Sequence, residues 1–234
     1  MTRLRYDEAP YDATSYGLGL PRRVTGLEVE GTSEGSVSLS WDPAGSADEY
    51  AVLRSRSPDS GYTEVAVLAN TAYTDDALVA GRTYHYKVLG RNITGDGPLS
   101  AEVTATTDLA PPQLTFDTSQ KREITVTVDL ADDNDEGEVR LERDGSEIAT
   151  LTDLDTLEYS DADSILDGEA YDYVAIRDTG DATARTDPET AIAYIPPVED
   201  LDLDGTEPQT LVAQWTDILN NGRYRVQIRD DTKE

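Results

Sequence analysis

The residues in this chain whose types most suggest metal chemistry lie in the acidic run Asp129–Glu138. Within it, Asp132, Asn134 and Glu136 alternate with other residues, which is how a calcium-binding EF-hand loop begins. The position that should close such a loop with a bidentate glutamate is Arg143, and no helical pattern flanks the run. We therefore interpret the run as a solvated loop between two strands and predict no metal ligands.

Histidine chemistry is restricted to one residue, His85. Alternation with Tyr84 and Tyr86 predicts that it is exposed on the outer side of a strand. A single histidine in a chain without cysteine makes neither a catalytic triad nor a zinc site. Paired carboxylates for glycoside hydrolysis would need a deep cleft, which a small β-sandwich rarely has. We predict no catalytic residues, no cofactor and no enzymatic activity.

Asn92–Thr94 (Asn-Ile-Thr) forms an N-glycosylation sequon, which is a weak signal by itself. We find no phosphate loop, dinucleotide fingerprint, zinc-ligand spacing or nucleophile elbow elsewhere in the sequence.

The charge of the chain is strongly acidic: 48 Asp and Glu against 19 Lys and Arg give a net charge of −29 over 234 residues. Such a surface repels nucleic acids and anionic lipids, so neither is an expected partner. No apolar run reaches the length of a membrane span, and we predict no membrane insertion. Only three of the 19 basic residues are lysines. This composition resembles that of proteins from salt-loving archaea and their viruses, because concentrated salt screens repulsion between surface charges.

The sequence also repeats itself, with a period of about 87 residues. Trp41 and Trp215 lie 174 residues apart in similar contexts. The middle copy pairs Gly81 with Gly168, Tyr84 with Tyr171, Tyr86 with Tyr173, Val52 with Val139, and Trp41 with Val128. Within the units, apolar and polar residues alternate, as in Val-Ser-Leu-Ser-Trp at 37–41, which is the period of half-buried antiparallel strands.

Two motifs in the first unit reduce the number of possible folds further. They are LVAGRTYHYKV at 78–88 and GDGPLS at 95–100, preceded by Trp41 at the end of the second predicted strand. Together they resemble the fibronectin type III family. The resemblance implies a seven-stranded, two-sheet sandwich in which Tyr84 forms a tyrosine corner with the loop before it.

The predicted fold is therefore all-β: tandem fibronectin type III or Ig-like β-sandwiches behind an extended N-terminal arm. We place the arm at 1–20, a sandwich at 21–108, a divergent sandwich at 109–195, and the start of a third at 196–234. The third unit supplies only three strands, which do not close a sandwich. Either the natural chain continues, or a partner completes the sheet by strand addition.

The arm differs in composition from the rest of the chain, since residues 1–23 carry a net charge of +1. Tyrosine and arginine, which often anchor interfaces, are concentrated in it. We predict that the arm docks onto an acidic protein surface, the alternative being a plain disordered tail. The candidate docking residues are Arg3, Arg5, Tyr6, Tyr11, Tyr16, Arg22 and Arg23.

These features resemble a virion protein of a haloarchaeal tailed virus: a tail fibre, baseplate component or capsid turret, assembled in the host cytoplasm without a signal peptide. The expected partners are other virion proteins through the arm, further copies of the chain in a homo-oligomer, and a host surface receptor through the distal modules. The alternative is a cell-surface adhesin, or the non-catalytic module of a secreted haloarchaeal hydrolase, located outside the cell.

Overall fold

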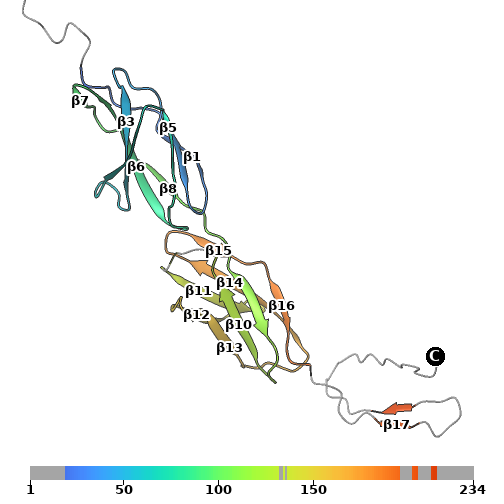
Figure 1. The fold of residues 1–234 in the computed structure, drawn as a ribbon. Helices are drawn as coiled ribbons and strands as arrows, with labels where there is room; N and C mark the ends of the chain where they lie inside the picture. Colours follow the sequence, from blue (N-terminus) through green and yellow to red (C-terminus); the bar gives the residue numbers. More distant parts are fainter. Residues whose placement is uncertain (1–18, 132–133, 135, 196–201, 205–211, 215–234) are drawn as a thin grey trace, which may run out of the picture. The chain divides into compact units, whose positions relative to one another are not determined.

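The computed structural model describes residues 19–131, 134, 136–195, 202–204 and 212–214 (Figure 1). Within these ranges the regular secondary structure is all β-strand, and no helix is long and apolar enough to cross a bilayer. The chain divides into two compact units. Most of the first precedes Pro111, and it also includes segments 132–137 and 178–184; the second comprises 111–131, 138–177 and 185–234. The fold class predicted from the sequence is confirmed.

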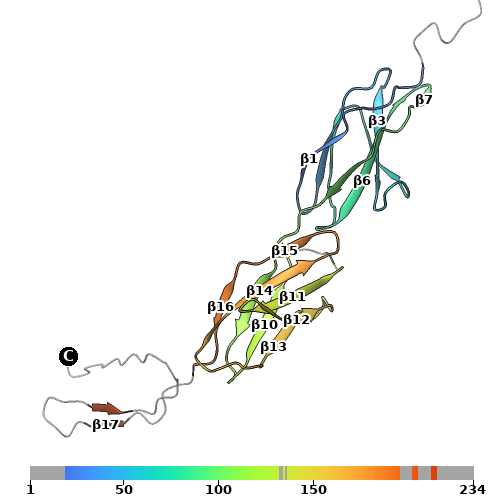
Figure 2. The ribbon, with the colours of Figure 1, turned by 180° about the vertical axis from the view of Figure 1, so that it is seen from behind.

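The first unit contains two antiparallel sheets, of orders β1-β2-β5 and β4-β3-β6, with β7 and β8 both pairing with β6 (Figures 1 and 2). The strands are β1 (Glu28–Thr32), β2 (Val37–Ser40), β3 (Glu49–Ser55), β4 (Thr63–Leu68), β5 (Ala72–Asp75), β6 (Thr83–Asn92), β7 (Gly95–Asp96) and β8 (Val103–Thr106).

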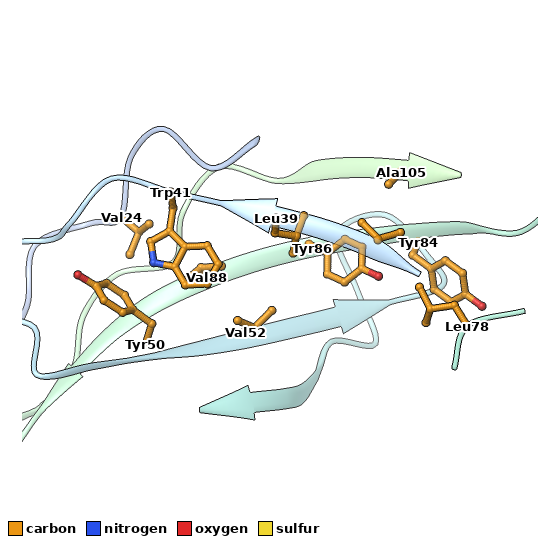
Figure 3. Close-up of a cluster of buried hydrophobic side chains, with 11 residues drawn as sticks. Val24, Leu39, Trp41, Tyr50, Val52, Leu78, Tyr84, Tyr86, Val88 and Ala105 are labelled. Carbon is orange, nitrogen blue, oxygen red and sulfur yellow. The ribbon is translucent and has the colours of Figure 1, made fainter. Parts of the chain in front are cut away.

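The core of this unit follows from the alternation in the sequence. Val37 and Leu39 of β2 are buried, whereas the serines between and after them are not. Trp41 packs edge-on against Tyr50, with ring centroids 5.7 Å apart and planes at 65° (Figure 3). Such an edge-to-face pair adds about 1 kcal/mol to the stability gained from burial alone.

The second unit has the same strand order, with sheets β13-β10-β9 and β12-β11-β14-β15 and with β16 pairing with β14. Its strands are β9 (Gln113–Asp117), β10 (Ile124–Asp129), β11 (Glu138–Arg143), β12 (Ser146–Leu151), β13 (Glu158–Asp161), β14 (Ala170–Asp178), β15 (Thr183–Arg185) and β16 (Glu189–Ile192). Val128 lies where the first unit has Trp41: each donates its backbone N–H to a carbonyl just before the fifth strand of its unit.

One residue pair predicted from the repeat, Val52 with Val139, is wrong. A bulge follows Val52 in β3, and the corresponding bulge in β11 follows Leu141 instead of Val139. The true spacing at this strand is 89 residues, because the segment leading to Leu141 is two residues longer than its counterpart in the first unit. A fixed offset of 87 does not detect such an insertion.

After β16 and residue 195, the structure describes only one short antiparallel pair of strands. β17 (Asp202–Asp204) pairs with β18 (Val212–Gln214). The rest of the predicted third unit, including Trp215, lies outside the described residues. A third sandwich therefore stays a prediction, as do the boundaries assigned to the arm and the modules.

Both units contain the tyrosine corner that the resemblance implies. The Tyr84 hydroxyl accepts a hydrogen bond from the Val79 N–H at 3.1 Å, and the Tyr171 hydroxyl accepts one from Leu166 at 2.8 Å. Gly81, in the loop that the first of these bonds holds, has a φ of 62°, a conformation that other residues adopt only with strain. The glycine and tyrosine of the motif thus form one structural device.

A second shared device was not predicted: a buried carboxylate that ties the two sheets together. In the first unit Asp75, on β5, is 3% exposed. It accepts hydrogen bonds from Tyr86 at 2.8 Å and from Arg54 at 2.9 Å, both on the opposite sheet. The arrangement satisfies a charge that would be costly to bury alone.

The second unit repeats this triad. Asp161, 1% exposed, accepts hydrogen bonds from Tyr173 and from Arg143, each at 2.6 Å. Burial, and then the hydrogen bond to the aspartate, raises the pKa of Tyr86 and of Tyr173 well above that of a free tyrosine.

We expect Asp75→Ala to lower the free energy of unfolding by about 3 kcal/mol, because it removes the acceptor for a buried phenol and leaves the Arg54 charge uncompensated. The neighbouring Asp76 is exposed, so Asp76→Ala is the matched control and should change stability by less than about 0.5 kcal/mol. Denaturant titrations in concentrated salt measure both. Equal effects of the two substitutions would show that the triad adds no more to the free energy of unfolding than an exposed aspartate does.

The two raised tyrosine pKa values predict a loss of stability in alkali. The folded chain keeps these protons at a pH where the unfolded chain, with ordinary tyrosine pKa values near 10, loses them. The stabilisation is thus fully present below about pH 10 and declines as the pH rises further. Thermal unfolding between about pH 9 and 11 should show a smaller decline for the double variant Tyr86→Phe, Tyr173→Phe. Tyr194→Phe, outside both triads, should leave the decline unchanged.

Candidate functional site

The first unit has a hollow at one end of its larger sheet, where β3, β4 and β6 meet. Its volume is about 310 Å³, at the lower end of the range for small-molecule sites. The lining residues are Arg54, Ser55, Arg56, Ser57, Gly61, Thr63 and Tyr84.

The hollow is built by the connection between β3 and β4. Ser55 Oγ donates to the carbonyl of Ser60 and accepts from the N–H of Ser57 at 2.9 Å, and Ser57 and Ser60 form an isolated bridge. In the second unit the corresponding connection is only the two-residue turn Asp144–Gly145. The longer loop that frames the hollow therefore has no counterpart at this connection of the second unit.

Two arginines lie over one aromatic ring in this hollow. The guanidinium carbons of Arg54 and Arg56 are 5.6 and 5.1 Å from the centroid of Tyr84, within the range of cation–π attraction. The charge of Arg54 is balanced by Asp75. Arg56 donates through Nη1 to the carbonyl of Thr83 and remains 42% exposed. Sequence reasoning missed this pair, although Arg56, a basic residue in a loop that the second repeat lacks, could have indicated it.

Next to the hollow, Glu102 contacts several polar side chains on the outer face of the same sheet. It accepts a hydrogen bond from Tyr62 and lies 3.1 Å both from Lys87 Nζ and from His85 Nδ1. The hydrogen bond from Tyr62, and then that from Lys87, lowers the pKa of Glu102 to about 2.

The expected exposure of His85 is therefore wrong. Its side chain is 12% exposed. It does face outward from the sheet, but Glu102 and Thr104 contact its ring there. Alternation predicted the face correctly and could not show that neighbouring side chains cover it.

Of the predicted docking residues, only Arg22 and Arg23 lie within the described part of the chain, and both are exposed just before β1. The backbone N–H of Arg22 donates to the carbonyl of Gly45 at 3.0 Å, which fixes the start of the sandwich. The other five candidates, Arg3, Arg5, Tyr6, Tyr11 and Tyr16, lie outside the described residues.

The EF-hand-like run lies between β10 and β11, as the repeat predicted. Asp132, Asp133 and Asp135 are outside the described residues, and Arg143 is held by Asp161. No group of three or more potential metal ligands occurs among the side chains that the structure describes.

The sequon asparagine has a structural role. Nδ2 of Asn92, the atom to which a glycan would be attached, donates to the carbonyls of Gly19 at 2.9 Å and Ser46 at 2.8 Å. Its Oδ1 accepts from the N–H of Thr94 at 2.8 Å. Asn92 thus fastens the incoming chain to the end of β6.

Comparison with known proteins agrees with this architecture. Residues 22–106 match the fibronectin type III domain family. They include the strands, the tyrosine corner and the hollow described above. This part of the chain thus resembles a fibronectin type III domain in both sequence and fold.

The fold extends beyond that domain. A two-domain fibronectin type III segment of chicken tenascin superimposes with a TM-score of 0.60, covering 73% of this chain and 98% of the segment at 19% identity. At that identity the similarity shows the fold alone. The chain thus has the fold of tandem fibronectin type III domains.

Two similar proteins in sequence are bacterial enzymes. A poly(3-hydroxybutyrate) depolymerase of Ralstonia pickettii is 44% identical over 87 residues, which are 37% of this chain and 17% of the depolymerase. An amylopullulanase of Thermoanaerobacter thermohydrosulfuricus is 30% identical over 97 residues, which are 38% of this chain and 6% of that enzyme. The chain therefore spans only a small part of the length of these relatives.

Proposed function

We propose that this chain is a non-catalytic segment that spaces and displays β-sandwich surfaces, in adhesion or in a larger structural assembly. The observation that supports this best is the match to a two-domain fibronectin type III segment along 73% of the chain. The two most buried carboxylates that we describe, Asp75 and Asp161, hold sheets together instead of facing a cleft. Such a fold hosts many roles, so the role has to be argued from composition and surface.

Composition favours a structural protein of a haloarchaeal virus particle. A net charge of −29 with few lysines suits a surface exposed to concentrated salt. The docking arm would attach the protein to other virion proteins, and the modules would project as a fibre, baseplate component or turret. In a symmetric particle the protein would be a homo-oligomer, and the distal modules would meet the host receptor.

A second candidate is the accessory module of a secreted hydrolase or a cell-surface adhesin. It is favoured by the 44% identity to part of a depolymerase and the 30% identity to part of an amylopullulanase. In that case the chain would work outside the cell, next to a catalytic domain or on the cell surface.

Peptide mass spectrometry of virus particles purified in concentrated salt separates the two candidates. For a virion protein we expect peptides of this chain at an abundance matching the known structural proteins of the particle. Recovery only from the cell envelope, or from the medium on the same polypeptide as a hydrolase domain, would contradict the virion proposal and support the second candidate.

The acidic composition also predicts dependence on salt. On dialysis from about 3 M to about 0.1 M NaCl the Debye length grows several-fold, and repulsion between surface carboxylates should loosen or unfold the sandwiches. Circular dichroism at both salt concentrations measures this. An unchanged spectrum and an unchanged melting temperature would contradict the proposed adaptation to salt.

A further inference from the structure

The hollow of the first domain has the features of a ligand site, and they do not depend on the proposed function. Its loop is held by hydrogen bonds between its own serines, so its shape exists before any ligand binds. Pre-organisation of this kind reduces the entropy lost on binding.

The second domain shows which parts of the hollow are needed for folding. Arg143 there pairs with Asp161 and lies 5.4 Å from the centroid of Tyr171, just as Arg54 pairs with Asp75 and lies over Tyr84. This arginine is therefore part of the sandwich framework. Arg56 and the loop that follows it have no counterpart in the two-residue turn of the second domain, so the framework does not require them.

Arg56 is placed to receive a negatively charged group. Its contacts with the Thr83 carbonyl and with an Asp181 oxygen 3.4 Å away both use Nη1. The pair with Asp181 is long, and the two side chains are 42% and 37% exposed, so it adds little stability. Among the described residues, the other nitrogens of the guanidinium remain available to a ligand.

We propose that the hollow binds a small carboxylate, with Arg56 as its principal contact. Arg54 is already neutralised by Asp75, so Arg56, whose pair with Asp181 is long and partly exposed, is the guanidinium that a singly charged ligand would engage. The planar guanidinium matches the two oxygens of a carboxylate. The hydroxyls of Ser57 and Thr63, which also line the hollow, supply polar contacts that a sugar acid or the carboxyl end of a peptide would use.

The test is a binding titration of the full chain in concentrated salt, followed by NMR of the backbone amides. The probes are D-glucuronate for a sugar carboxylate, N-acetylglycine for a peptide carboxyl end, and D-glucose as the neutral sugar. We expect at least one of the two carboxylates to shift the amides of Arg56, Ser57 and Gly61, whereas glucose should not. The tighter of the two probes identifies the source of the carboxylate.

The substitution Arg56→Gln should weaken binding about tenfold or more, since it removes the charge-assisted hydrogen bonds. Arg56→Lys keeps the charge without the planar fork and should retain part of the affinity. Arg185→Gln, a surface arginine of the second domain paired with Glu142, is the matched control and should bind like the unaltered chain. Amide spectra confirm that each variant is folded.

Three results would overturn the proposal. They are no shift with either carboxylate, equal shifts with glucose, and unchanged affinity in a folded Arg56→Gln variant. None of them would affect the proposed spacing and display role, which does not require this hollow.

Discussion

The buried aspartate of each sandwich is the constraint on which the rest of this structure depends. Asp75 lies on the smaller sheet of the first domain, and both of its hydrogen-bond donors lie on the larger sheet. The triad therefore fixes the two sheets against each other. Because an unpaired charge there would be costly, the domain folds in the register that brings arginine and tyrosine to the carboxylate.

The sequence predicted those parts of the structure that depend on local periodicity. Alternation along 37–41 and 84–88 identified strands and their buried faces, whereas the corner at Tyr84 was implied by the resemblance to the fibronectin type III family. The triad could not be predicted in this way, because its members come from three different strands, with Tyr86 and Arg54 lying 11 and 21 residues from Asp75. In a chain with 48 acidic residues, nothing local distinguishes Asp75 from the exposed Asp76 beside it.

The candidate site was missed for a related reason. Arg56 stands out only when the two repeats are aligned by structure, which places the long β3–β4 loop opposite the turn Asp144–Gly145. A fixed repeat offset of 87 residues hides this difference, because an insertion before Leu141 shifts the register by two. Internal duplication thus serves as a control within one chain. Contacts that both copies share maintain the fold, whereas a segment that only one copy has is free to serve binding.

The salt that the composition indicates also determines what kind of recognition such a site can use. At molar ionic strength the Debye length is about 3 Å, so attraction between an arginine and a distant anion is largely screened. A site that works under these conditions has to recognise its ligand through direct contact, with hydrogen bonds of fixed geometry. A guanidinium positioned over the Tyr84 ring, beside a loop fastened by Ser55, meets that requirement. The many surface carboxylates would repel an anionic ligand mainly at long range. Concentrated salt screens this repulsion as well, so they do not prevent binding at the site.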